Sequence, residues 1–134
     1  MKCRFFSANE WLYPDTDIES GEQQARLVAA ENSYACVQLL ITEPGCEIDW
    51  SWKNKQPDAP KLEMFRLHKV CVNLNAAEFN FTLPLGTVAD HYTRQAPFWV
   101  YDAMEPIESN TIVCDDSVHA LYLRWSTKGI KAGE

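Results

Sequence analysis

Residues 25–42 read ARLVAAENSYACVQLLIT, two apolar runs separated by a polar break at residues 31–33. In the second run, residues 34–42, side chains two apart share one face of a β-strand. One face carries only apolar side chains, namely Ala35, Val37, Leu39 and Ile41. The other face is mixed, and a strand of this kind belongs inside a sheet rather than at its edge. We therefore predict a central core strand over residues 34–42, ended by the turn signal Pro44-Gly45.

The same period-two alternation recurs along the chain. It predicts further strands at residues 2–6, 46–52, 62–75, 78–83, 98–101, 111–114 and 118–126. Between Leu67 and Val70 the alternation changes parity, which indicates either a bulge or two short strands that run together. Residues 102–110 are expected to be a connection, and only residues 88–95 have some helical character. Short strands separated by turns are typical of an all-β fold, so we predict an antiparallel, Ig-like β-sandwich of two packed sheets with little or no helix.

Composition limits the class of protein. The 134 residues suit a single domain. A net charge of −7 argues against nucleic acid or an anionic membrane as a partner, and no apolar run is long enough for a spanning helix. Five cysteines at irregular spacing do not form a disulfide framework, which favours a reducing compartment. We expect a cytoplasmic protein, or a secreted one if a leader has been removed.

The glycine-rich end of the chain, residues 128–134, is followed by no pairing strand. We therefore expect residues 1–134 to be one sandwich domain, a fragment or N-terminal module of a longer chain. An unpaired sheet edge exposes backbone hydrogen-bonding groups, so a homodimer formed through that edge is a further expectation.

Five residues are candidates for a carbohydrate or interdomain contact. They are Trp50, Trp52, Trp99, Tyr101 and Asp102. Aromatic rings on a sandwich can stack on sugar faces, although large aromatic side chains more often line the core. Asp102 directly follows an aromatic run, where it either contacts a ligand or caps a turn.

Metal and catalytic chemistry have weaker support. His68 with Cys71, and Cys114 with Asp115, Asp116 and His119, lack the repeated paired spacing of zinc ligands. The scattered acids could supply a carboxylate pair for glycoside chemistry, but no catalytic motif accompanies them. We predict no metal, no cofactor and no catalytic residue.

Three segments carry a family resemblance. They are residues 27–40 (LVAAENSYACVQLL), residues 96–104 (APFWVYDAM) and the pair LYLRW and GIKAGE at 121–125 and 129–134. Together they resemble the N-terminal β-sandwich of proteins related to the family-123 glycoside hydrolases. The resemblance implies an accessory domain that precedes a catalytic (β/α) barrel, and the catalytic Asp-Glu pair would lie in that barrel.

Three functional hypotheses of different classes follow. A non-catalytic accessory domain that packs against a following barrel predicts buried Trp50 and Trp52 and an exposed apolar edge near residues 98–104. An independent carbohydrate-binding module predicts exposed, coplanar rings instead. A small enzyme or metal protein, the third hypothesis, would need two or more of His68, His91, His119 and the nearby acids to converge.

Overall fold

The computed structural model describes residues 1–42, 45–53, 60–73, 94–114 and 118–130. Over this part of the chain the protein is all-β, with antiparallel sheets and one short 3-10 turn. The elements are β1 (Lys2–Ser7), η1 (Ile18–Ser20), β2 (Tyr34–Thr42), β3 (Cys46–Asp49), β4 (Leu62–Val72), β5 (Phe98–Pro106), β6 (Thr111–Cys114) and β7 (His119–Ser126). Among the described residues, no helix has the length and apolar character needed to cross a membrane.

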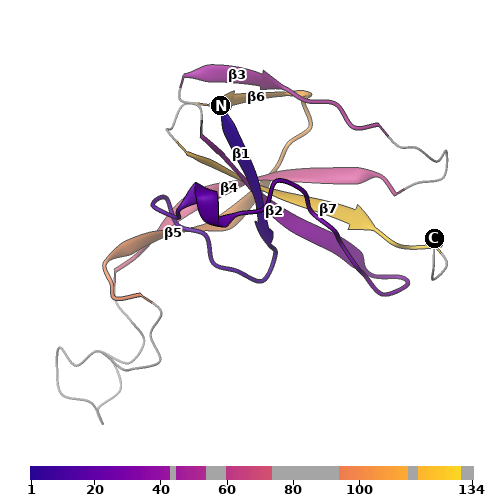
Figure 1. The fold of residues 1–134 in the computed structure, drawn as a ribbon, viewed down its shortest axis with the longest axis horizontal. Coiled ribbons are helices and arrows are strands. Elements are labelled where there is room, and N and C mark those ends of the chain that lie inside the picture. The colour runs from indigo at the N-terminus through magenta and orange to yellow at the C-terminus, as the bar shows by residue number, and fades with distance from the viewer. Residues whose placement is uncertain (43–44, 54–59, 74–93, 115–117, 131–134) are drawn as a thin grey trace, which may run out of the picture.

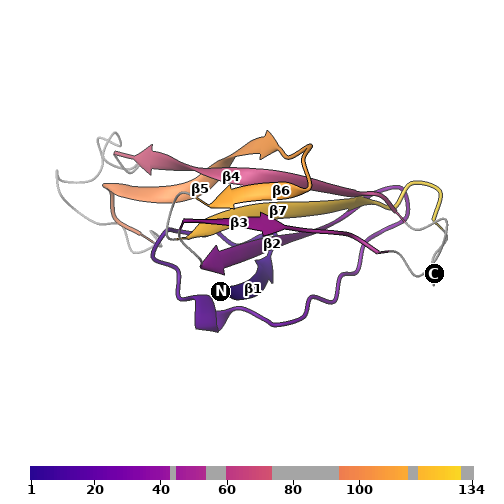
Figure 2. The same ribbon diagram turned by 90° about the horizontal axis from the view of Figure 1, so that it is seen from above.

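The strands form two layers. The larger sheet has the order β1-β2-β7-β4-β5, and β3 pairs with β6 in a two-stranded sheet. Figure 1 shows the small sheet above the larger one, and Figure 2, seen from above, shows that it lies over β2 and β7. This arrangement confirms the predicted all-β class, the antiparallel pairing and the two packed sheets.

Strand β2 lies between β1 and β7, which confirms that it is not an edge strand, but the central position of the larger sheet belongs to β7. Its apolar face buries Val37 and Ile41 against the small sheet. Its mixed face is buried too, because Leu40 is fully buried and Gln38 is 5% exposed. Both faces of the larger sheet are therefore covered along this strand.

Two clusters of side chains make up the core. The inter-sheet core lies between the layers and contains Val37, Ile41, Met64, Ile112, Cys114, Leu121 and Leu123. The second cluster, on the opposite face of the larger sheet, contains Phe6, Leu12, Leu40, Leu67, Tyr101 and Ala120. We call this cluster the loop-side core, because the irregular residues 8–22 cover it in place of a sheet.

Residues 8–22, the N-terminal cover, are tied to the sheet at three places. The side-chain Nε2 of Gln38 donates to the carbonyl oxygens of Ser7 (2.8 Å) and Glu10 (2.7 Å). The backbone N–H of Tyr101 donates to the carbonyl of Leu12 (2.9 Å). Phe5 and Glu22 exchange two backbone hydrogen bonds of 2.8 and 2.9 Å. The cover thus crosses the sheet from β1 to β5 and returns to β1.

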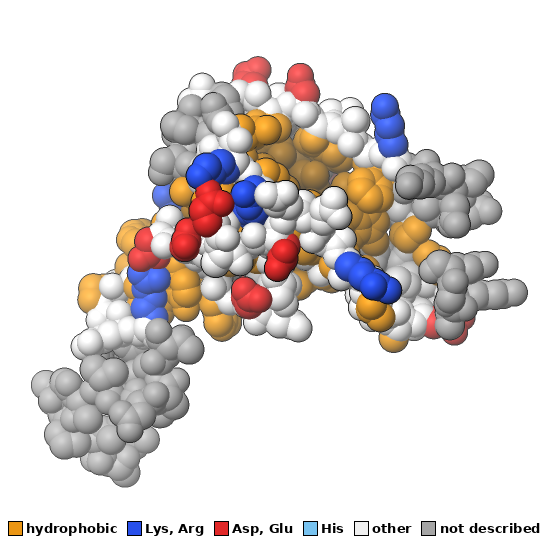
Figure 3. Space-filling model, viewed as in Figure 1, with side chains coloured by type: hydrophobic (Ala, Val, Ile, Leu, Met, Phe, Trp, Pro, Cys, Tyr) orange, Lys and Arg blue, Asp and Glu red, His pale blue; other side chains and the backbone are white. Residues whose placement is uncertain are grey.

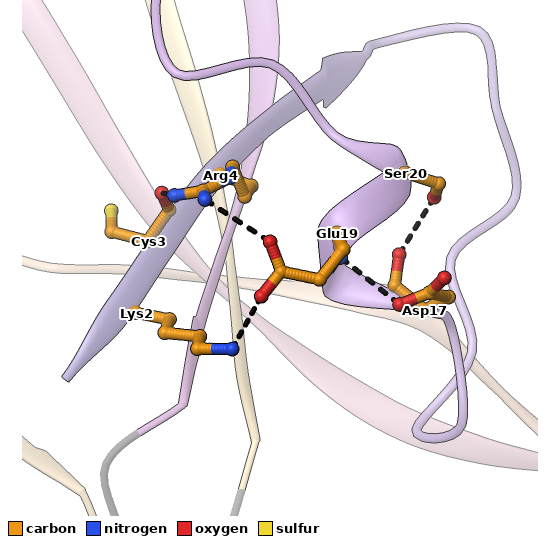
Figure 4. A network of polar contacts seen from close by, with 6 residues as sticks. All are labelled: Lys2, Cys3, Arg4, Asp17, Glu19 and Ser20. Atoms are coloured by element: carbon orange, nitrogen blue, oxygen red, sulfur yellow. Dashed lines mark hydrogen bonds and ion pairs between the residues drawn. The ribbon is translucent and has the colours of Figure 1, made fainter.

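Polar contacts fix the return of the cover to β1 (Figure 4). Glu19 accepts hydrogen bonds from Lys2 and, at 3.2 Å, from Arg4. Asp17 caps η1 by accepting from the backbone N–H of Glu19 at 3.0 Å. The hydrogen bond from Lys2, followed by the nearby charges, lowers the pKa of Glu19 below its usual value.

The small sheet does not cover the whole of the larger one. Figure 3 shows hydrophobic side chains in the hollow between β3 and the β1 side of the molecule. Partly buried apolar side chains from both layers pack against the inter-sheet core, including Cys3, Phe5, Leu39 and Ile48. This side of the sandwich is consequently more open than its middle.

The structure corrects the predicted ends of two strands, β3 and β5. Strand β3 ends at Asp49, although the backbone N–H of Trp50 still donates to Asn110 (2.9 Å). Strand β5 continues to Pro106, so the prediction that residues 102–110 form a connection is wrong for its first five residues. Residues 103–106 are exposed, so they carry no apolar alternation that could reveal a strand. The predicted strand at 78–83 and most of the segment 88–95 lie outside the described residues.

Candidate functional site

The predicted irregularity between Leu67 and Val70 lies in the pairing of β4 with β5. His68 pairs with Ala103 and Lys69 pairs with Tyr101, so Asp102 is an extra residue on β5. A bulge of this kind bends a strand and re-aims the side chain of the inserted residue. The bulge therefore belongs to β5, not β4. Asp102 lies within a strand, so the alternative prediction that it caps a turn is wrong.

Beside this bulge the surface is hollowed. The hollow has a volume of about 360 Å³ and is lined from the N-terminal cover, β2, β4, β5 and β7. Its lining includes Glu10, Trp11, Gln38, Asp102, Met104 and Tyr122. The volume lies at the lower end of the range for small-molecule sites, and we call this feature the bulge hollow.

The Trp-Leu pair of the cover, Trp11 and Leu12, shows why the hollow forms. Leu12 points into the loop-side core and is 1% exposed, whereas the next side chain along, Trp11, is 62% exposed. Because neighbouring side chains of an extended segment point in opposite directions, burying Leu12 directs the indole toward solvent at the rim. Irregular backbone fills the space above the sheet less evenly than a second sheet would.

Hydrogen bonding orders the floor of the bulge hollow. The side chain of Gln38 is buried, with 5% exposure, and its Nε2 group already donates to the carbonyl oxygens of Ser7 and Glu10. Within the described part of the chain, its Oε1 accepts no hydrogen bond. The hydroxyl of Tyr101 donates to the carbonyl of Val118 (3.0 Å), so its proton is already used in this hydrogen bond. The floor therefore presents an acceptor.

Tyr122 is the most perturbed titratable group beside the hollow. Burial is the main cause that raises the pKa of Tyr122 to about 12, and a hydrogen bond with Cys36 adds to it. The phenol is therefore neutral throughout the physiological pH range, and it contributes a ring and a hydroxyl rather than a charge.

The five candidates from the sequence are divided between the two sides of the larger sheet. Tyr101 and Asp102 line the bulge hollow. Trp99 is 53% exposed and, two residues before Tyr101 in register with β4, lies on the same side of the sheet. Trp50 and Trp52 belong to the opposite side, where they adjoin the inter-sheet core.

Trp50 and Trp52 match neither function hypothesis fully. Trp50 is half-buried and donates from Nε1 to the carbonyl of Ser109 (3.2 Å). Trp52 is 48% exposed, so it is not the buried residue that the accessory reading predicts. Its ring lies 5.4 Å from that of Trp125 at an angle of 53°, so this pair is not a coplanar platform either.

The possible metal ligands are dispersed where the structure shows them. His68 is exposed and contacts Glu105 (Nε2–Oε2 2.7 Å), while His119 and Cys114 are buried. His91, Asp115 and Asp116 lie outside the described residues. Within the described ranges, no three His, Cys, Asp or Glu side chains come together in a way that could hold a metal ion.

Sequence reasoning missed Glu10, Trp11, Gln38 and Met104 as site residues. No motif singled out Trp11, and Gln38 was only a polar side chain on the mixed face of the strand predicted at residues 34–42. Their convergence depends on how an irregular segment crosses the sheet, which local alternation does not encode. The available signal for a site was the change of alternation between Leu67 and Val70, together with the aromatic-acid pair Tyr101-Asp102.

Comparisons with protein-family models, with curated proteins and with solved structures found no match to this chain. The resemblance to the family-123 glycoside hydrolase group therefore stays a prediction from short motifs.

Proposed function

We propose that this chain is a non-catalytic, Ig-like β-sandwich module that binds carbohydrate in the bulge hollow. The proposal is supported most by the placement of Asp102, an extra strand residue beside a hollow with an exposed tryptophan at its rim. Sandwich loops and strand irregularities often carry binding residues on a rigid scaffold.

The chemistry of the hollow suits a sugar ring. A pyranose has apolar C–H faces, which stack on rings such as the indole of Trp11. Its hydroxyl groups need hydrogen-bond partners, and the carboxylates of Glu10 and Asp102 and the amide of Gln38 supply them. A small number of polar groups among apolar ones is the usual composition of a ligand pocket.

The test is direct titration of the protein with soluble oligosaccharides in a calorimeter. We expect saturable binding of at least one β-linked hexasaccharide. Replacing Trp11 with alanine removes the stacking surface and should weaken binding by about fivefold or more. Trp11 is exposed, so this substitution should leave the fold intact.

The matched control is Trp52→Ala on the other side of the sheet. It removes an indole of similar exposure that does not line the bulge hollow. Equal losses in the two variants, or no binding of any oligosaccharide, would contradict the proposed site.

A second candidate is the accessory domain that the family resemblance implies, packed against a following catalytic barrel of the same chain. The exposure of Trp99 (53%) and Met104 (55%) favours it, because it predicts an exposed apolar edge at residues 98–104. Light scattering separates this reading from association of two copies through a sheet edge. A stable dimer abolished by a charged residue at Met104 would support self-association instead.

A further inference from the structure

We propose that the bulge hollow selects amino sugars that carry a free, protonated amine over their N-acetylated and neutral counterparts. This inference rests on the proposed carbohydrate-binding function and specifies its ligand class. It follows from the charges, the hydrogen-bonding groups and the aromatic surface of one hollow.

The charge of the hollow has one sign. Its lining contains two carboxylates, Glu10 and Asp102, and no lysine, arginine or histidine among the described residues. Both acids are exposed, and no ion pair or hydrogen bond to either carboxylate is found within the described part of the chain. An uncompensated pair of carboxylates on a protein of net charge −7 attracts a cation.

The hydrogen-bonding groups favour a donor-rich ligand. Ionised carboxylates only accept hydrogen bonds, and the Nε2 group of Gln38 is already used by Ser7 and Glu10. The Oε1 atom of Gln38 is an acceptor on a buried side chain of the lining. An ammonium group has three donors and no acceptor, so it complements these groups better than a hydroxyl does.

The aromatic surface adds to this preference. Trp11 at the rim, with the ring of Tyr122 in the lining, offers π-faces beside the carboxylates. A cation placed over an indole is attracted by the ring quadrupole, and the same ring stacks on the sugar C–H face. One amino-sugar residue can use both interactions at once. N-acetylation removes the charge and two of the three donors, so it removes the basis of the preference.

The experiment compares three hexamers that share a β-1,4-linked glucan backbone: glucosamine hexamer, N-acetylglucosamine hexamer and cellohexaose. The titrations are run at about pH 5.5, where the sugar amines are protonated. We expect the glucosamine hexamer to bind about five- to tenfold more tightly than the other two. Raising the salt concentration should reduce this difference, because screening acts on the charge term.

Variants locate the preference. Asp102→Asn and Glu10→Gln keep shape and remove charge, so each should lower the ratio of the affinity for the glucosamine hexamer to the affinity for cellohexaose. Glu47→Gln removes the same charge from the exposed face of β3, on the opposite side of the molecule. It controls for general attraction of a polycation to an acidic protein, and it should leave the preference unchanged.

The outcomes separate this inference from the proposed function. Equal affinity for all three hexamers would overturn the amine preference and leave carbohydrate binding supported. A preference that Glu47→Gln lowers as much as Asp102→Asn would also overturn it, because the attraction would then not reside in the hollow. Binding of none of the three would contradict both.

Discussion

The two faces of the larger sheet are covered by different means. On one face, β3 and β6 form a regular ladder of four residue pairs that packs over β2 and β7. On the other, residues 8–22 cross the sheet without a strand and hold it by three sets of hydrogen bonds. The bulge hollow lies on the second face only.

The difference teaches where this fold has room for function. A sheet placed on a sheet aligns side chains at regular intervals and leaves little space between the layers. An irregular segment has to satisfy its backbone groups individually, so it buries some side chains, such as Leu12, and exposes neighbours such as Trp11. The side chains of the proposed carbohydrate site therefore lie on the irregular side.

The largest expected effect comes from emptying either core. Leu40 lies in the loop-side core and Leu121 in the inter-sheet core, at 0% and 1% exposure. Leu40→Ala and Leu121→Ala should each lower the free energy of unfolding by about 2–5 kcal/mol, as measured by urea denaturation. Val28→Ala, at a side chain that is 91% exposed, is the control. A loss below about 1 kcal/mol for Leu40→Ala alone would show that the N-terminal cover does not enclose a true core.

A smaller loss is expected from Gly21→Ala in the N-terminal cover. A Cβ atom there would lie 2.6 Å from Cζ of Phe6 and 2.7 Å from Cβ of Arg4, so the cover could not sit as closely on β1. We expect a loss of about 1–3 kcal/mol, measured by thermal and urea unfolding. Combining it with Phe6→Leu should cost less than the sum of the single changes, because the ring is what the new methyl group meets. Strict additivity would disprove this cause.

The next largest loss of stability is expected at Arg124, which lies near two aromatic rings on the face of the larger sheet that the N-terminal cover crosses. Its Cζ atom is 4.8 Å from the centroid of Tyr34 and 4.9 Å from that of Phe65. Its Nε donates to Glu63 at 2.7 Å. Arg124→Met keeps much of the stem but loses the charge, and should lower stability by about 1 kcal/mol. Arg26→Met, at an exposed arginine, is the control, and an equal effect of both would show that the stacking contributes nothing.

The smallest effect concerns pH at the contact between η1 and β1. The folded pKa of Glu19 is lowered, mainly by Lys2, so its contribution to stability is present above the unfolded value of about 4.5 and is lost as the pH falls through the folded pKa. The protection factors of the Phe5 and Glu22 amides, which compare their hydrogen exchange with the intrinsic rate at each pH, should therefore fall on acidification. In Glu19→Gln, exchange should already be faster at neutral pH, with a weaker acid dependence. If Glu19→Gln left the acid dependence of exchange unchanged, other carboxylates would be its cause.

The sequence predicts the strands of this fold better than it predicts the hollow. Alternation identified β2 and its interior position, because burial on both faces leaves a clear apolar signature. It also located the register change beside Leu67, but it assigned the extra residue to the wrong strand, since exposed residues 103–106 give no signal. The positions of Glu10, Trp11 and Gln38 around one hollow depend on contacts far apart in sequence, which local patterns do not specify.

The route of the N-terminal cover has a consequence for how the protein is made. Residues 8–22 are synthesised before their binding surface exists, because Tyr101 of β5 and Ala120 of β7 come more than 75 residues later, as their numbers show. Until then the loop-side core around Leu12 lacks Tyr101 and Ala120. During synthesis on the ribosome, residues 8–22 therefore stay exposed until β5 and β7 have been made. Their docking onto the larger sheet forms contacts between residues far apart in sequence, and such contacts slow folding.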